Sequence, residues 1–136
     1  MYTHHLDPAF SDTDALGHIN NTHLPVWFEQ ARTDIFRLFT PDLDPRQWRL
    51  ILARYDVEFR AELYYGQHVE IRTYLTRLGT SSFTVTQEAW QNHTLAAFGN
   101  TVMVHYDHAG KRAMAIEGEL RQALEAHLQS SAKTAT

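Results

Sequence analysis

Hydrophobic residues recur at helical spacing in the segment that follows residue 21. The apolar positions are Leu24, Trp27, Phe28, Ala31, Ile35, Leu38 and Phe39, with charged and amide side chains between them. Because this spacing places the apolar side chains on one face of a helix, it predicts one long amphipathic helix over residues 22–39. Thr22 is an N-cap residue type, and Pro25 is tolerated because it falls in the first helical turn.

Later segments alternate between apolar and polar residues, as strands do. From Tyr55 to Leu63 the alternation with charged residues is strict, which predicts a strand with one buried face. Further strands, divided by turns, are predicted over residues 68–78, 82–91, 95–106 and 112–116. Gly99 indicates a bulge in the longest of them. Residues 117–128 return to helical spacing, so a short C-terminal helix is predicted.

The order of these elements defines the expected fold class. A short first strand, one long helix, four or more antiparallel strands and a terminal helix indicate an α+β fold in which one sheet wraps one helix. A chain of 136 residues is long enough to bury a core of its own. We therefore predict a single domain over residues 1–129, followed by a frayed tail over residues 130–136.

Composition narrows the classes of function. The chain has no cysteine, which excludes disulfides, thiolate metal sites and cysteine nucleophiles. With 12 basic and 16 acidic side chains its net charge is −4, so it lacks the electrostatic footprint of a nucleic-acid-binding protein. No apolar run approaches the length of a membrane span, and the start of the chain does not resemble a signal peptide. A cytoplasmic protein with no membrane span is expected.

Candidate chemistry concentrates in the segment SDTDALGHINNTH, residues 11–23. An EF-hand loop beginning at Asp12 fails, because Leu16 and His23 stand where calcium ligands are needed. A metal site on Asp12, Asp14 and His18 lacks further ligands at suitable spacing, and neither a metal nor a bound cofactor is expected. A glycosidase pair lacks a groove for sugar, and the G-x-S-x-G nucleophile motif is absent.

Two interpretations of this segment remain open on physical grounds. A carboxylate beside a glycine-led turn that opens a helix suits acyl transfer, because a helix N-terminus stabilises a developing oxyanion. The carboxylate would then attack an acyl carbon or activate a water molecule. Alternatively, Asp12 and Asp14 serve only to shape the entry into the helix.

The stretch DTDALGHINN, followed by WFEQAR, resembles the signature of the 4-hydroxybenzoyl-CoA thioesterase-like family of hotdog-fold acyl-CoA thioesterases. The segment RYDVEFRAELYYGQHVEIRTYLTRLGTSSFTVTQ extends the likeness, which covers about residues 5–125. The resemblance implies a five-stranded antiparallel sheet wrapped around a central long helix, with a short C-terminal helix. It also implies hydrolysis of an acyl-CoA thioester.

The resemblance also assigns roles to individual residues. Asp14 matches the catalytic aspartate, as nucleophile or general base, whereas Asp12 matches a structural position. Gly17 and the backbone amides after it match the turn that polarises the thioester carbonyl at the helix N-terminus. His18, Asn20 and Asn21 match residues that hold this turn and line the pocket.

Two positions depart from the family pattern. Leu24 replaces a frequent tyrosine, and Asn21 stands where one branch of the family carries a histidine. Without a histidine at that position, more of the chemistry falls on Asp14.

The resemblance implies a homodimer or homotetramer with active sites at the subunit interface. Asp14 of one subunit would then face Tyr65 or the turn Thr80, Ser81 and Ser82 of the other. Arg60 is a candidate for binding the phosphates of CoA, as arginine often does. Two other functions remain possible: a hotdog hydratase or dehydratase acting on an acyl thioester, and a non-catalytic module that binds acyl thioesters.

Overall fold

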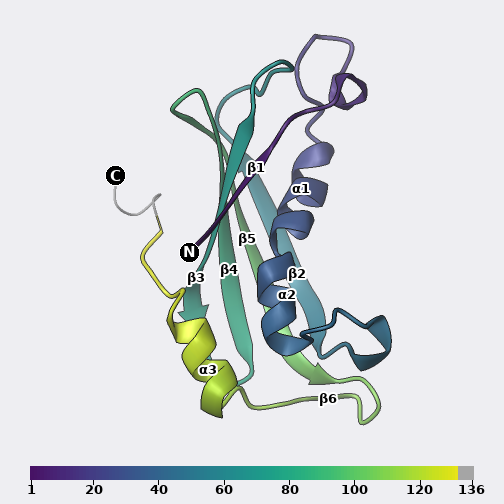
Figure 1. The fold of residues 1–136 in the computed structure, drawn as a ribbon, viewed down its shortest axis with the longest axis vertical. Helices are drawn as coiled ribbons and strands as arrows, with labels where there is room; N and C mark the ends of the chain where they lie inside the picture. The colour runs from purple at the N-terminus through teal and green to yellow at the C-terminus, as the bar shows by residue number, and fades with distance from the viewer. Residues whose placement is uncertain (132–136) are drawn as a thin grey trace.

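The computed structural model describes residues 1–131, in which one antiparallel sheet packs against three helices (Figure 1). The strands are β1 (Tyr2–Leu6), β2 (Leu50–Phe59), β3 (Val69–Leu78), β4 (Ser82–Gln91), β5 (Thr94–Asp107) and β6 (Arg112–Ala113). The helices are α1 (His23–Ala31), α2 (Thr33–Phe39) and α3 (Gly118–Glu125). Five strands follow the order β1-β3-β4-β5-β2, and the two-residue β6 pairs with the end of β5. The predicted α+β class is confirmed.

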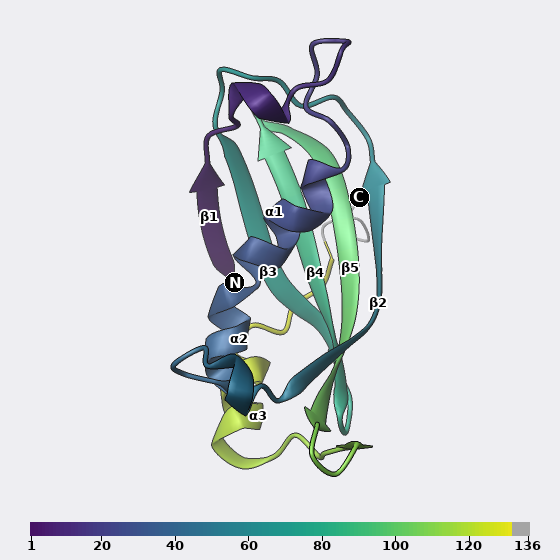
Figure 2. The same cartoon turned by 90° about the vertical axis from the view of Figure 1, so that its right-hand side faces the viewer.

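The sheet curls around α1 and α2, which lie across its concave face (Figure 2). Core residues form two clusters along this face. The first holds Trp27 and Phe28 of α1 against Ile71 and Ala97, and the second holds α2 and α3 against Phe83 and its neighbours. Burial of these apolar side chains is the main force that holds the helices on the sheet.

The prediction of one continuous helix over residues 22–39 was wrong. The helical segment is interrupted at Arg32, which separates α1 from α2. The Thr33 hydroxyl donates to Gln30 O at 2.7 Å, which competes with the helical hydrogen-bond ladder. Arg32 turns its buried side chain into the sheet, where Nη1 donates to Gln87 Oε1 at 3.1 Å and to Thr101 Oγ1 at 3.2 Å. These tertiary contacts tie the junction of α1 and α2 to the sheet.

Several predicted boundaries also change. The predicted strand over residues 82–91 is confirmed, but the last strand is only Arg112–Ala113. Gly99 is not at a bulge: the register of β4 and β5 shifts at Ala89 and Trp90 instead. A Cβ atom at position 99 would stand 2.9 Å from the Phe28 ring, so the glycine lets α1 approach the sheet. Of the tail predicted over residues 130–136, residues 132–136 lie outside the described part of the chain.

Strand β2 differs from its prediction in position and in burial. It starts earlier and ends at Phe59, and most of its apolar side chains are exposed in the single chain. Tyr55 is 54% exposed and Phe59 is 49% exposed. The reason is topological: β2 stands at the edge of the sheet, where only β5 pairs with it. An apolar strand at a free sheet edge is a surface that another chain can cover.

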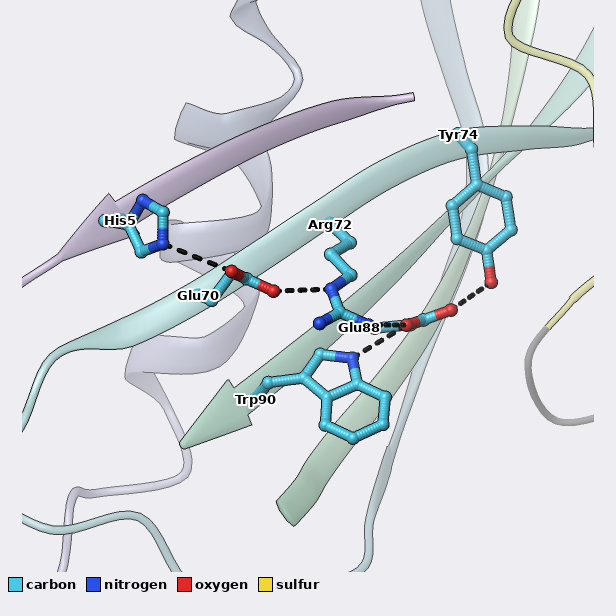
Figure 3. A network of polar contacts seen from close by, with 6 residues as sticks. All are labelled: His5, Glu70, Arg72, Tyr74, Glu88 and Trp90. Atoms are coloured by element: carbon cyan, nitrogen blue, oxygen red, sulfur yellow. Dashed lines mark hydrogen bonds and ion pairs between the residues drawn. The ribbon is translucent and has the colours of Figure 1, made fainter. Parts of the chain in front are cut away.

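The face of the sheet opposite the helices carries a polar network (Figure 3). Glu88 is buried at its centre, where one carboxylate oxygen accepts the Tyr74 hydroxyl and the other accepts Trp90 Nε1–H at 2.7 Å. Arg72 approaches from β3, with Nη1 3.9 Å from Glu88 and the guanidinium 4.5 Å from the Trp90 ring centre. The buried carboxylate is therefore satisfied by hydrogen bonds and by a cation.

Glu70 connects this network to β1 and makes part of the protein's folding stability dependent on pH. Its carboxylate accepts Arg72 Nε–H at 2.5 Å and contacts His5 Nε2 at 3.2 Å. The bond from Arg72 holds the pKa of Glu70 below its ordinary value. A lowered carboxyl pKa adds stability above the unfolded-state pKa, and that stability is lost as the pH falls through the folded-state value.

We expect Glu70→Gln to lower the melting temperature by about 2–4 °C at pH 7, because the charge that Arg72 binds is removed. The difference should shrink as the pH falls below the ordinary carboxyl value of about 4.3 toward the lowered pKa of the folded state, where the wild-type carboxyl also becomes protonated. Thermal unfolding followed by circular dichroism from pH 3 to pH 8 measures both. A difference that stays constant down to pH 3 would contradict the assignment.

Candidate active site

Residues 12–23, the motif loop, fold back on themselves before α1 begins. Thr13 and Ile19 form an antiparallel bridge, Asp14 N–H donates to His18 O at 2.8 Å, and Gly17 N–H donates to Asp14 O at 3.2 Å. Gly17 has φ = +84°, a conformation that glycine adopts without strain. The glycine of the motif therefore makes the tight turn that carries Asp14 and His18.

The structure separates the two aspartates of the motif. Asp12 uses both carboxylate oxygens locally: Oδ2 accepts Ala9 N–H at 2.8 Å, and Oδ1 lies 3.4 Å from His23 Nδ1. Asp14 Oδ1 accepts Leu16 N–H at 2.8 Å and the backbone N–H of residue 18 at 3.2 Å. Among the described residues, nothing bonds to Asp14 Oδ2. One oxygen of Asp14 is therefore anchored while the other remains open to a ligand.

The backbone amides after Gly17 are nearly all engaged. Those of His18, Ile19 and Asn20 donate to the Asp14 carboxylate, to Leu63 O at 2.8 Å and to Asp12 O at 2.8 Å, respectively. Asn21 N–H has no acceptor within residues 1–131. Asn20 Oδ1 accepts both the N–H and the hydroxyl of Thr22, which holds the backbone on either side of Asn21. Of the amides predicted to polarise a carbonyl, Asn21 N–H is thus the one open to a ligand.

A second segment, residues 60–65, lies against the motif loop. His18 forms an antiparallel bridge with Tyr64, and their rings meet edge to face with centres 5.5 Å apart. His18 Nδ1 lies 3.4 Å from Glu62 Oε2. The buried Gln91 of β4 fixes this segment, because its amide bonds both the N–H and the C=O of Tyr64 at 2.9 Å. The sheet thereby positions the side chains that face the motif loop.

The two segments enclose a cavity of about 720 Å³, which we call the motif cavity. It is lined by Asp14, Leu16, His18, Ile19, Asn20, Asn21, Leu24, Phe59, Arg60, Ala61, Glu62 and Leu63. The predicted site residues Asp14, His18, Asn20, Asn21 and Arg60 are therefore brought together. Gly17 shapes the loop beside the cavity.

Other predicted residues lie elsewhere in the chain. Tyr65 packs edge to face on Phe10, with ring centres 5.9 Å apart, and is not among the lining residues. Thr80, Ser81 and Ser82 form the β3–β4 turn at the opposite end of the sheet, close to α3 (Figure 1). Thr80 O accepts Ile116 N–H at 2.7 Å. Within one chain this turn does not reach the motif cavity.

Glu62 is a lining residue that the sequence did not single out. In the sequence it is one more charged residue in an alternating run and carries no signal of its own. It reaches the site because the chain leaves the sheet after Phe59, and Ile19 N–H binds Leu63 O at 2.8 Å. Only this tertiary contact places Glu62 beside His18.

Two further observations concern metal ions and membranes. In residues 1–131, no three His, Asp or Glu side chains lie close enough together to hold a metal ion. Asp12 and Asp14, which share the motif loop with His18, instead bind backbone amides and His23. None of the described helices is long and apolar enough to span a membrane.

A curled antiparallel sheet wrapped around a central helical segment is the hotdog fold, and comparison with solved structures agrees. A predicted thioesterase from Bacillus stearothermophilus matches with a TM-score of 0.92 and 39% identity, over 96% of this chain and 98% of that one. A thioesterase from Thermus thermophilus, complexed with coenzyme A and Zn, matches with a TM-score of 0.79 and 27% identity over 90% and 95%. A hypothetical protein from Staphylococcus aureus in complex with CoA shares the fold at 14% identity, with a TM-score of 0.81 over 95% and 86%.

Residues 8–124 match the sequence model of the thioesterase-like superfamily. The chain belongs to this superfamily, and the predicted family is confirmed. Sequence comparison with curated proteins finds no match.

Proposed function

We propose that this protein hydrolyses an acyl-CoA thioester in the motif cavity. One observation carries the proposal: Asp14 Oδ2 and Asn21 N–H lack partners among the described residues, while the groups around them are hydrogen-bonded. A carboxylate oxygen and an open backbone N–H beside one cavity are the two groups that acyl transfer needs. Superfamily membership supports the reaction class.

In the proposed mechanism the thioester carbonyl oxygen accepts the Asn21 N–H. The amide and the adjacent N-terminus of α1 stabilise the negative charge that develops when the carbonyl carbon is attacked. Asp14 then acts in one of two ways. Its carboxylate attacks the carbon to form a mixed anhydride that water cleaves, or it takes a proton from a water molecule that attacks directly.

CoA is the expected carrier of the acyl group. Two proteins of the same fold were solved with CoA bound. Arg60 lines the motif cavity and pairs with Glu58 at 3.0 Å, at a partly exposed position. An arginine at the rim of a site commonly binds phosphate. We therefore propose that Arg60 contacts a CoA phosphate. We also propose that the reaction takes place in the cytoplasm.

A second copy of the chain is proposed to cover β2. The exposed apolar residues of this edge strand are Ile51, Leu52, Tyr55 and Phe59, and Val26 of α1 lies beside a cavity shared with β2. Two edges joined about a two-fold axis would continue the sheet and bury these side chains. Antiparallel pairing would also turn the partner end for end, which brings its β3–β4 turn toward the end of the sheet that carries Asp14. This supports the predicted role of Thr80, Ser81 and Ser82 across the interface. It does not support that of Tyr65, which follows Tyr64 at the same end of the sheet as the motif loop.

We expect the wild-type protein to have at least twice the mass of one chain in light scattering at micromolar concentration. Tyr55→Glu should shift it to the monomer, because the change places a charge in the middle of the proposed contact. Phe10→Glu is the matched control, since Phe10 is also an exposed aromatic residue but is not part of β2 and does not line the cavity that β2 shares with α1. A wild-type monomer with full hydrolytic activity would rule out this assembly.

Release of free CoA from a panel of short, long and aromatic acyl-CoAs tests the proposed function. Hydrolysis of at least one of them is expected. Formation of a hydrated or dehydrated acyl-CoA without thiol release would instead identify a hotdog hydratase or dehydratase. Saturable binding with no conversion would identify a non-catalytic acyl-thioester module.

A further inference from the structure

The motif cavity contains a second group with the chemistry of a general base. The His18 ring presents Nδ1 to Glu62 Oε2 at 3.4 Å, and His18 Nε2 has no partner within the described chain. A carboxylate beside one ring nitrogen favours the tautomer with its proton on that nitrogen. The lone pair is then on Nε2, on a ring that is about one-third exposed and lines the same cavity as Asp14.

The imidazole is not required to build the loop. The hydrogen bonds that form the turn use the backbone of His18: its N–H reaches Asp14 Oδ1 at 3.2 Å, and its C=O accepts Asp14 N–H at 2.8 Å. The bridge to Tyr64 is also a backbone contact. An alanine could make all of these bonds. The hydrogen bonds that form the loop therefore do not require the His18 ring or its carboxylate partner.

One route of the reaction needs such a base. In direct attack, Asp14 can itself take the proton from water and deliver it to the departing thiolate. If Asp14 instead becomes part of a mixed anhydride, it cannot at the same time take the proton from the water molecule that cleaves this anhydride. The anhydride route therefore needs a second group that accepts and then donates a proton.

We propose that His18, oriented by Glu62, is this general base; the inference rests on the proposed function. Asp14 first attacks the thioester carbon, and the C–S bond breaks to give the mixed anhydride and the CoA thiolate. His18 Nε2 takes a proton as the water oxygen bonds to the acyl carbon of the anhydride, and Asn21 N–H stabilises the oxyanion. The bond to the Asp14 oxygen then breaks, and the imidazolium gives the proton to the CoA thiolate released earlier. The sequence converts one thioester and one water into one acid and one thiol.

Chemical rescue tests the base. His18→Ala should lower kcat by about a hundredfold or more, the range expected when a general base is lost. Added imidazole should restore part of that rate in proportion to its concentration, because it can occupy the space left by the ring. His18→Asn serves as a second variant if the alanine protein does not fold.

His23→Ala is the matched control. His23 is also paired with a carboxylate at 3.4 Å, five residues further along, but it does not line the motif cavity. We expect its rate to stay close to that of the wild type and to be insensitive to imidazole after subtraction of the uncatalysed reaction. Glu62→Gln should lower kcat by about tenfold, without rescue, because it removes the orienting charge but leaves the ring in place.

The outcomes separate this inference from the proposed function. If the wild-type protein releases CoA and folded His18→Ala matches it, the base assignment is wrong and the proposed function stands. A folded His18→Ala protein that is inactive and not rescued by imidazole assigns His18 a structural role and also overturns the inference. If the wild-type protein releases no CoA, both fail.

Discussion

Asp14→Asn is expected to lower kcat for acyl-CoA hydrolysis by about a hundredfold or more, the scale associated with loss of a nucleophile or a general base. Asparagine keeps the carbonyl oxygen that accepts Leu16 N–H, so the loop should keep its shape. What is lost is the charge and basicity of the second oxygen, which has no partner among the described residues. Acyl-CoA binding should survive, because a neutral amide no longer repels an anionic ligand.

Asp12→Asn is the matched control for this change. Both oxygens of Asp12 are used within the loop, so we expect a loss of stability on the order of 1 kcal/mol and near-normal turnover. Thiol release and melting temperature, measured on both variants, separate the two roles. Near-normal hydrolysis by Asp14→Asn would remove Asp14 from the mechanism. An inactive Asp12→Asn protein beside an active Asp14→Asn protein would exchange the roles of the two aspartates.

Gly17→Val is expected to lower turnover by about tenfold or more, with a smaller effect on folding. A Cβ atom at this position meets no atom within 4 Å, so the cost comes from the backbone at φ = +84° and not from a clash. Valine strongly disfavours this conformation, and relieving the strain would move the amides of Leu16 and His18 that anchor Asp14. The open oxygen of Asp14 would then move relative to Asn21 N–H.

Gly17→Asn distinguishes backbone strain from the mere addition of a side chain. Asparagine enters the left-handed region more readily than other residues, so this variant should retain much of the wild-type rate. Steady-state kinetics with circular dichroism on both proteins make the comparison. Equal turnover of folded Gly17→Val and wild-type protein would count against the proposed site.

Local patterns in the sequence were sufficient to predict the element types. Alternation along residues 82–91 corresponds to β4, because a strand with one face on a core must alternate at every position. The apolar spacing after Thr22 corresponds to a helical face that packs on the sheet. Gly17 was readable as a turn residue because its conformational freedom is a property of glycine itself.

Contacts between distant segments decided what those patterns could not. The guanidinium of Arg32, at the break between α1 and α2, is bound by Gln87 and Thr101, which lie far along the chain. The alternation of β2 indicated a buried face, but within one chain Tyr55 and Phe59 of that face are uncovered, whereas Val57 packs against the core. Spacing cannot show this, because burial depends on which element stands on the other side of a strand.

The candidate site also combines features that the sequence determined with features that only the tertiary structure decided. The sequence by itself determined that Asp14, Gly17 and His18 lie in one tight turn before a helix, because neighbours in a short loop cannot separate. It could not show that both oxygens of Asp12 have partners while one oxygen of Asp14 is open, since both are aspartates in the same loop. Nor could it place Glu62 beside His18, because that contact forms only when the chain beyond β2 folds back and pairs with the motif loop.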